Sequence, residues 1–491
     1  MVVFLLVLVV VLALLGAVHW YVWRRLVRDV TTRGSLPRRL GTAAVVVLPL
    51  LSFAALGSSR AGAPFVLQQV VAWPGFLWLA LLLYVVLALV VGEAVRPVLY
   101  AWLSRRAKAA APEPVALPVP APEPVPANAE NPAETTGPAT PSAPAAPSAP
   151  AAPAAPSAPA AQAAPKTPVT RATPAESASP ASPASPAETA ATAETVEPKE
   201  PAPTADRPSD PASPAEVSRR LFVSRVVGGA AAAAAVGTVG LGAYGVLRGP
   251  RIKRVTVPLA RLPRAAHGYR IAVVSDIHIG PILGRAHTQR IVDTINSAQP
   301  DLVAVVGDLV DGTVENLGPA AEPLARLRAR HGSFFVTGNH EYFSGADAWV
   351  DHVRELGLRP LRNDRVEIAA GFDLAGVDDV AGESEGQGPD FVRALGDRDR
   401  ARAAVLMAHQ PVVIHDAVRH GVDLQLSGHT HGGQLWPGNH LAELANPTVA
   451  GLERYGDTQL YVSRGAGAWG PPVRVGAPSD ITIVELASKQ A

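Results

Sequence analysis

A stretch of about a hundred residues in the middle of the chain limits what the whole sequence can fold into. Residues 111–217 consist almost entirely of Ala, Pro, Ser, Thr, Glu and Val, and they hold 28 of the 48 prolines. Such a stretch has too little bulky apolar surface to offset the entropy lost on ordering, so we expect a disordered, semi-extended Pro/Ala-rich linker. The alternative is a ligand for a partner that recognises proline-rich segments. In either case the 491-residue chain must fold as separate parts.

Three apolar runs precede the linker. Residues 2–23 carry no charged side chain over a length that crosses about 30 Å of hydrocarbon as a helix, and residues 40–57 and 75–92 are also apolar. We expect all three to be transmembrane helices. A cleaved signal peptide is the alternative for the first run, although its charged start and cleavage site are missing. A re-entrant or interfacial segment is the alternative for the second run, which contains Pro49.

The arginines between these runs predict the orientation of the helices. Six arginines lie between the first and second runs, whereas residues 58–74 carry only Arg60. By the positive-inside rule the first loop is cytoplasmic, so the amino terminus lies outside and the third run ends in the cytoplasm.

An Ala/Gly-rich apolar run at residues 226–247 follows the linker. Arg219 and Arg220 precede it, in a pattern that resembles a twin-arginine export signal at an internal position. Either as a signal or as a fourth membrane helix, this run would carry the rest of the chain out of the cytoplasm. We expect that outward orientation, although four basic residues directly after the run favour the opposite one.

Charge and cysteine content exclude several classes of function. The 43 Lys and Arg against 42 Asp and Glu leave no basic excess, so nucleic acid is not an expected partner. The chain has no cysteine, which excludes disulfides, thiolate zinc sites, iron–sulfur clusters and a cysteine nucleophile. Any metal ion must therefore be held by His, Asp, Glu, Asn or backbone oxygen.

From about residue 255 the composition becomes that of an ordinary globular domain. Helix-like stretches at residues 287–298 and 320–330 lie between short apolar runs that end in polar residues. These runs are residues 271–274, 302–306, 334–336, 405–407, 424–426 and 460–462. Buried strands that alternate with helices predict an α/β domain whose strand ends carry the chemistry.

Side chains that can bind metal follow almost every expected strand. They are Asp276 and His278, Asp308 and Asp311, Asn339, His340 and Glu341, His409, and His429 and His431. Residues i and i+2 of an extended chain point to one face, so each D-x-H or H-x-H pair is a natural metal clamp. Gly307, Gly338 and Gly428 each precede such a residue, where the lack of a Cβ lets the backbone bend and approach an ion.

Five blocks occur in a fixed order: D-x-H, G-D-x-x-D, G-N-H-E, a lone His and G-H-x-H. Together they resemble the calcineurin-like metallophosphoesterase superfamily, and the longer stretches LSGHTHGGQ and SRGAG resemble its bacterial membrane-associated branch. The resemblance covers most of residues 267–487. It implies a four-layer α/β/β/α sandwich with two divalent metal ions at its rim.

The resemblance also implies roles for individual residues. One ion would be bound by Asp276, His278 and His431. The second ion would be bound by Asn339, His409 and His429. The carboxylate of Asp308 would bridge the two ions. Such a mixture of oxygen and imidazole ligands suits manganese, iron or zinc. His340 is the implied catalytic residue, which stabilises the transition state or protonates the leaving oxygen. We expect Asp311 and Glu341 to orient imidazoles, and Arg474 to contact a substrate phosphate or to lie in a surface salt bridge.

These features predict a membrane-anchored phosphohydrolase that cleaves phosphomonoesters or phosphodiesters with a hydroxide activated by two metal ions. Two alternatives stay open: a pyrophosphatase acting on a lipid-linked or nucleotide precursor, and a non-catalytic membrane sensor or scaffold. The expected partners are a phosphorylated substrate, lipid-linked in one alternative, and the lipid bilayer. We expect a multi-pass protein of the cell membrane with its catalytic domain outside the cytoplasm. The expected segments are a membrane region (1–108), the linker (109–217), a twin-arginine-like segment with a fourth apolar helix (218–249) and the metallophosphoesterase domain (250–491).

Overall fold

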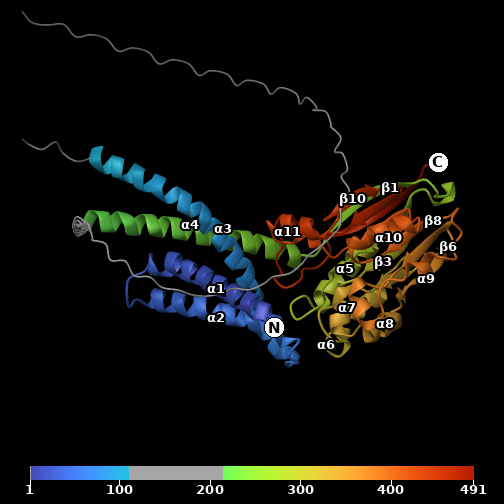
Figure 1. Ribbon diagram of the computed structural model, residues 1–491, viewed down its shortest axis with the longest axis horizontal. Coiled ribbons are helices and arrows are strands. Elements are labelled where there is room, and N and C mark those ends of the chain that lie inside the picture. The colour runs from blue at the N-terminus through green and yellow to red at the C-terminus, as the bar shows by residue number, and fades with distance from the viewer. Residues whose placement is uncertain (1, 110–213, 491) are drawn as a thin grey trace, which may run out of the picture. The chain divides into compact units, whose positions relative to one another are not determined.

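The computed structural model describes residues 2–109 and 214–490, so the predicted linker lies almost wholly outside the described residues. The described part of the chain contains four helices that are long and apolar enough to cross a membrane. They are α1 (Val2–Trp23), α2 (Leu36–Ser58), α3 (Phe65–Ala109) and α4 (Pro214–Leu247) (Figure 1). Each expected apolar run is therefore helical, and α2 continues through Pro49 without a break.

Small residues let the apolar helices pack closely. A Cβ at residue 75 of α3 would lie 2.5 Å from Leu51 O of α2, and Ser52 Oγ donates a hydrogen bond of 2.7 Å to Gly75 O. Close backbone approach at a small residue, together with a polar side chain bonded across the contact, is typical of helix packing in membranes. The four helices and the domain that follows belong to one compact unit.

Two six-stranded sheets form the centre of the domain after α4 (Figure 1). The first sheet runs, in spatial order, β1 (Arg251–Leu259), β12 (Asp480–Ser488), β2 (Tyr269–Val274), β3 (Leu302–Val306), β4 (Ser333–Val336) and β5 (Arg359–Pro360). The second runs β10 (Gly451–Tyr455), β11 (Thr458–Val462), β9 (Leu424–Ser427), β8 (Ala403–Met407), β7 (Phe372–Gly376) and β6 (Asp364–Ile368).

Alternating side chains of each strand separate the layers. In β2, Ile271 and Val273 pack into the core between the sheets, whereas Ala272 and Val274 pack against the outer helices. The helices α5 (Arg285–Ser297), α6 (Val314–Ala321) and α8 (Ala346–Glu355) cover the first sheet. The second sheet is covered by α9 (Phe391–Leu395) and α10 (Ile414–Arg419). This confirms the expected α/β/β/α sandwich.

The sequence-based expectations differ from the structure at several elements. All six expected strands are present, but the helix expected at residues 320–330 is wrong. There α6 ends at Ala321 and gives way to a 3-10 turn, Glu322–Arg326, because Pro323 has no N–H with which to continue the α-helical hydrogen bonds. The strands β1, β5, β6, β7, β10 and β12 were not predicted. In the edge strand β1, the exposed Arg251 and Arg254 and the half-buried Lys253 interrupt the apolar residues, so the strand lacks a continuous apolar run.

Parallel pairing determines where the strands end. The strands β2, β3 and β4 are parallel neighbours, as are β8 and β9 in the other sheet. The carboxyl ends of parallel strands meet at one edge of a sheet, so the loops after these five strands form a common rim. The metal-competent residues singled out above lie in these loops, except for Asn339, His340 and Glu341, which form the first turn of the short helix α7 (Asn339–Ser344) after β4.

Candidate metal centre

One cluster of metal-competent atoms joins the loops after β2 and β9, which belong to different sheets. Asp276, His278 and His431 are buried, and their ligand atoms lie within 4.8 Å of one another. The Nε2 atom of His431 lies 3.0 Å from Nε2 of His278 and 3.4 Å from Oδ1 of Asp276. The three side chains predicted for one ion are therefore together.

A second cluster lies beside the first. Asp308, His409 and His429 also offer ligand atoms within 4.8 Å of one another. His409 Nε2 lies 3.1 Å from Asp308 Oδ2, and His429 Nδ1 lies 3.0 Å from Asn339 Oδ1. Since the same Oδ2 atom is 3.9 Å from His278 Nε2, the Asp308 carboxylate stands between the two clusters.

The backbone at this rim is held in an unusual conformation. Only eight described residues other than glycine have a positive φ, and five of them are predicted metal ligands. These are Asp276, His278, Asp308, His429 and His431, with φ between 49° and 72°. Non-glycine residues in this region are strained, and such strain gathers at functional sites, where the surrounding structure maintains it.

Three glycines make the close approach that the sequence predicted. A Cβ at residue 338 would lie 2.3 Å from Asp308 Oδ1, and a Cβ at residue 428 would lie 2.4 Å from Asp276 Oδ2. Gly307 has φ +72°, which a side chain would strain. The two carboxylates thus have their space only because the facing residues lack side chains.

The second cluster contains a contact that calls for a cation. His409 Nδ1 donates to Val306 O at 2.9 Å, so in the neutral ring Nε2 presents a lone pair to the Asp308 carboxylate. Two lone pairs at 3.1 Å would repel, so a positive charge is needed between them. Without metal, a proton on Nε2 supplies that charge: although burial disfavours both charged groups, the pair keeps the pKa of Asp308 well below and that of His409 well above the usual range. A divalent cation can take the place of this proton, and the donor set fits one.

Comparison with known proteins agrees with this geometry. The calcineurin-like phosphoesterase family profile matches residues 269–433. The chain is 38% identical over 270 residues to a transmembrane protein with metallophosphoesterase domain from Danio rerio, covering 52% of this chain and 61% of that protein. An uncharacterized metallophosphoesterase from Helicobacter pylori is 38% identical to the chain, and the match covers 50% of this chain and 67% of that protein. For one from Aquifex aeolicus the identity is 35%, with 51% of this chain and 97% of the relative covered.

The chain belongs to the calcineurin-like phosphoesterase family. Both bacterial relatives carry the same domain, in agreement with the predicted superfamily. The chain spans only about three fifths of the Danio rerio protein, so the match concerns the phosphoesterase domain rather than that whole protein.

In this phosphoesterase domain Asp311 orients two imidazoles, as the sequence suggested. Its Oδ1 accepts hydrogen bonds from Nδ1 of His278 at 2.9 Å and from Nδ1 of His340 at 2.7 Å. Burial alone would lower the pKa of His340, but the carboxylates of Asp311 and Asp308 outweigh it and raise that pKa to about 9. The His340 ring is therefore fixed in direction and protonated at neutral pH.

Glu341 has a different task from the one expected, because no imidazole of the described residues hydrogen-bonds to its carboxylate. Its carboxylate accepts three backbone N–H groups, from Asp308 at 3.0 Å, Leu309 at 2.8 Å and Gly338 at 2.6 Å. Burial and the Asp308 charge raise the pKa of Glu341 to about 7. The side chain thus fastens the two loops after β3 and β4 to each other.

Arg474 is neither exposed nor placed to meet a substrate phosphate, which corrects both expectations. The side chain is buried and donates to Gly467 O at 2.7 Å and His431 O at 3.0 Å, while Nη2 lies 3.0 Å from His431 Nδ1. It therefore positions His431 from behind. No spacing pattern ties these two residues, because their contact arises only when the chain after β11 crosses back over the rim.

We expect Gly338→Ala to weaken metal binding at least about tenfold, as loss of a supporting contact does in other metal sites. The new Cβ would lie 2.3 Å from Asp308 Oδ1 and 2.4 Å from Asp308 N, so the carboxylate must move. Metal content after dialysis against graded free Mn²⁺ measures the effect. Gly284→Ala is the matched control, since nothing lies within 4 Å of its new Cβ. Equal metal content in both variants would contradict the role of Asp308.

In the metal-free protein, Asp311→Asn should lower the pKa of His340 from about 9 toward the ordinary 6.5. Because the folded value lies above the unfolded one, the His340–Asp311 pair contributes its full stability below about pH 6.5 and loses it as the pH rises through about 9. NMR titration of the imidazole signals, assigned with His340→Gln, gives this pKa. A value that stays near 9 in the variant would refute the pairing.

Proposed function

We propose that this chain is a membrane-anchored phosphohydrolase that cleaves phosphomonoester or phosphodiester bonds with two divalent metal ions. The observation that supports it is the meeting of two ligand clusters on either side of Asp308 at the rim of the sandwich. Family membership makes phosphate esters the natural substrate class. A sensor or scaffold without catalysis would have no use for a complete ligand set held in strained backbone.

In this proposal the metal ligands are the seven residues predicted from the sequence. Asp276, His278 and His431 would hold one ion, Asn339, His409 and His429 the other, and Asp308 both. Manganese, iron or zinc suits these nitrogen and oxygen donors. Two such ions supply Lewis-acid stabilisation of the phosphoryl oxygens and lower the pKa of water toward neutrality.

The side chains around the ligands would do the remaining work. His340 is partly exposed at the rim, and in the metal-free protein its pKa is about 9, because Asp311 and Asp308 stabilise its protonated form. It can therefore donate a proton to the leaving oxygen as the ester bond breaks. Asp311 accepts a hydrogen bond from Nδ1 and so fixes the direction of the ring. The donated proton is then the one on Nε2, which faces the substrate.

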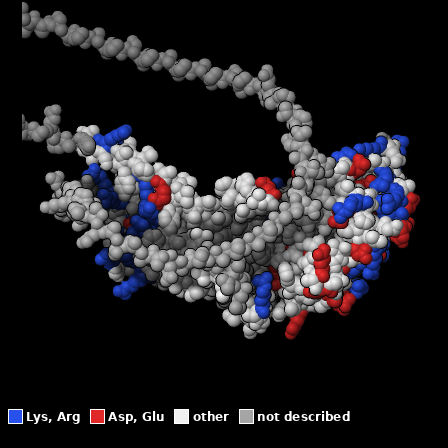
Figure 2. Space-filling model, in the orientation of Figure 1, with Lys and Arg blue, Asp and Glu red and all other residues white. Residues whose placement is uncertain are grey.

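We further propose a multi-pass topology with the domain outside the cytoplasm. The arginines of the first loop gather with those near the end of α3 and the start of α4, at one end of the helices (Figure 2). They are Arg24, Arg25, Arg28, Arg96, Arg219 and Arg220. The metal centre instead shares a pocket with the turn between α2 and α3, the poorly charged loop predicted to lie outside. By the positive-inside rule the arginine end is cytoplasmic.

The segments of this proposal keep the boundaries predicted above. Residues 1–108 form the membrane region, residues 218–249 hold the last membrane helix, and residues 250–491 form the phosphoesterase domain. The helix bounds of α3 and α4 and the start of β1 support these divisions.

The full-length protein should release phosphate from an aryl phosphate only with added divalent metal, and Asp308→Ala should reduce kcat/KM at least about a thousandfold. Asp293→Ala, which removes an exposed carboxylate on α5, should leave the rate unchanged. Hydrolysis that persists in Asp308→Ala and in the presence of a chelator would overturn the proposed mechanism.

A reporter fused after Ala491 tests the topology. We expect a β-lactamase fusion to confer resistance and a green fluorescent protein fusion to stay dark, because the first works outside the cytoplasm and the second inside. The converse pattern would place the catalytic domain in the cytoplasm. It would mean that the basic residues after α4 outweigh the six arginines of the first loop.

A further inference from the structure

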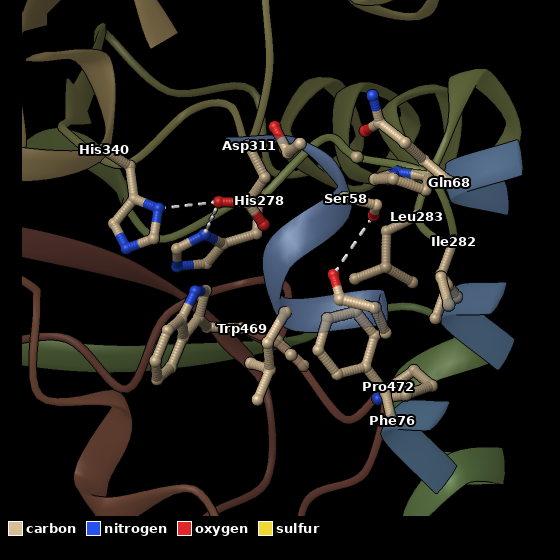
Figure 3. Close-up of a pocket in the computed structure, with 18 of the residues that line it drawn as sticks. Ser58, Gln68, Phe76, His278, Ile282, Leu283, Asp311, His340, Trp469 and Pro472 are labelled. Carbon is tan, nitrogen blue, oxygen red and sulfur yellow. Dashed lines mark hydrogen bonds and ion pairs between the residues drawn. The ribbon is translucent and has the colours of Figure 1, made fainter. Parts of the chain in front are cut away.

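A pocket with a cavity volume of about 180 Å³ joins the candidate metal centre to the membrane helices (Figure 3). One of its walls belongs to the centre and consists of His278, Asp311 and His340. The other comes from the end of α2 and the beginning of α3, including Leu56 and Phe76. The site that would carry out hydrolysis therefore opens onto the membrane helices rather than onto water alone.

The two walls differ in chemistry. Figure 3 shows the hydrogen-bonded His278, Asp311 and His340 on one side and apolar side chains on the other. The apolar group on that other side consists of Phe76, Ile282, Leu283 and Pro472, whereas Trp469 lies beside His340, with ring centroids 5.8 Å apart. Arg60, in the turn between α2 and α3, adds a positive charge to the lining. A ligand that matches the whole pocket carries an anionic head at one end and a hydrocarbon group at the other.

Part of the apolar wall lies within segments that are apolar enough to cross a membrane. Leu56 belongs to the candidate span Leu36–Gly57, and Phe76 belongs to the span Phe65–Ala107. Leu56 lies at the end of its span that leads into the turn between α2 and α3, and Phe76 lies in the first third of its span, after that turn. A hydrocarbon chain in the surrounding bilayer would thus lie at the level of the pocket, close to the membrane surface.

Exposed apolar side chains surround this side of the phosphoesterase domain. Phe343 and Trp469 line the pocket and are still largely exposed. The short helix α11 (Gly438–Ala445), which contacts the loop of His431, presents Leu441 and Leu444 at 71% and 85% exposure. Bulky apolar side chains this exposed, gathered beside membrane helices, are typical of a surface that meets lipid.

We propose that the substrate is a membrane amphiphile, a phosphate ester of a long-chain alcohol, whose phosphate lies at the metal centre and whose hydrocarbon chain packs against Leu56 and Phe76. This rests on the phosphohydrolase function proposed above and names its substrate class. Water adds through its oxygen to phosphorus and releases one proton to solvent, the ester P–O bond breaks, and the leaving oxygen takes a proton from His340, which then regains one from solvent. The products are inorganic phosphate and a lipid alcohol that stays in the membrane.

Alkyl phosphates of two chain lengths test the inference with the full-length protein in lipid nanodiscs and Mn²⁺. Butyl phosphate reaches the metal centre only, whereas octyl phosphate, kept below its critical micelle concentration, also reaches the apolar wall. Each buried methylene strengthens binding about fourfold, so burial of only two gives at least about a tenfold higher kcat/KM for octyl phosphate.

The Phe76→Ala variant should reduce this octyl-to-butyl ratio at least about threefold, because part of the apolar wall is lost. Val70→Ala is the matched control, since Val70 is an apolar residue of the same helix, 65% exposed and absent from the pocket lining. Partition of octyl phosphate into the disc is the same for both variants and cancels in the comparison. Leu56→Ala, at an exposed position in the lining, provides a second test should Phe76→Ala fail to fold.

The outcomes separate the two proposals. An octyl-to-butyl ratio near one in the wild-type protein, with metal-dependent hydrolysis of both esters, would overturn the amphiphile inference and leave the phosphohydrolase function standing. A high ratio that neither Phe76→Ala nor Leu56→Ala lowers would also overturn the amphiphile inference, because the hydrocarbon chain of octyl phosphate would then bind elsewhere. No hydrolysis of any ester with any divalent metal would overturn the function itself, and the inference with it.

Discussion

The buried carboxylate of Asp308 is the constraint on which the rest of the site depends. It lies 3.1 Å from His409 Nε2 and accepts a backbone hydrogen bond from His340 at 2.9 Å. Burying a charge in this way is costly unless opposite charge compensates for it. The backbone N–H of Asp308 is held by Glu341, and Gly338 leaves space for its oxygen. The loops after β3, β4 and β8 are thus arranged around one group that a divalent cation would satisfy.

Sequence reasoning located the residues at strand ends well, and for a physical reason. Residues such as Asp276 and His431 follow short buried strands directly, and parallel pairing brings the ends of such strands to one edge regardless of what separates them in the chain. The same reasoning failed for Glu341 and Arg474. Their partners are backbone groups and a ring nitrogen, which lie close only because of the path that the loops take. The hydrophobic periodicity of the sequence carries no information about that path. The helix expected at residues 320–330 failed for a local reason, the proline at 323.

The membrane-helix wall of the pocket could not have been predicted from the sequence either. Phe76 precedes His278 by about two hundred residues and lies on the other side of the Pro/Ala-rich stretch, so no motif spans both. Hydropathy predicts that residues 75–92 cross a membrane, yet it does not say which face of the helix meets protein. Only the packing of α3 against α2 and the domain loops assigns Phe76 to the lining of a metal-competent pocket.

The membrane helices contact a buried segment of the domain that contains Val473 and Arg474. Arg474 in turn contacts His431, a predicted metal ligand. Gly242 of α4 accepts a backbone hydrogen bond from Arg474, and a Cβ at residue 242 would lie 2.7 Å from Val473 Cγ1. Val473 belongs to the apolar cluster formed by α3 and α4, and the Arg474 guanidinium in turn holds His431. A domain cut off from its helices would leave this valine without its apolar partners and the arginine without one backbone contact. Since interiors are close-packed and transmit such losses, His431 would be less firmly held, and the metal affinity of the isolated domain should fall below that of the whole chain.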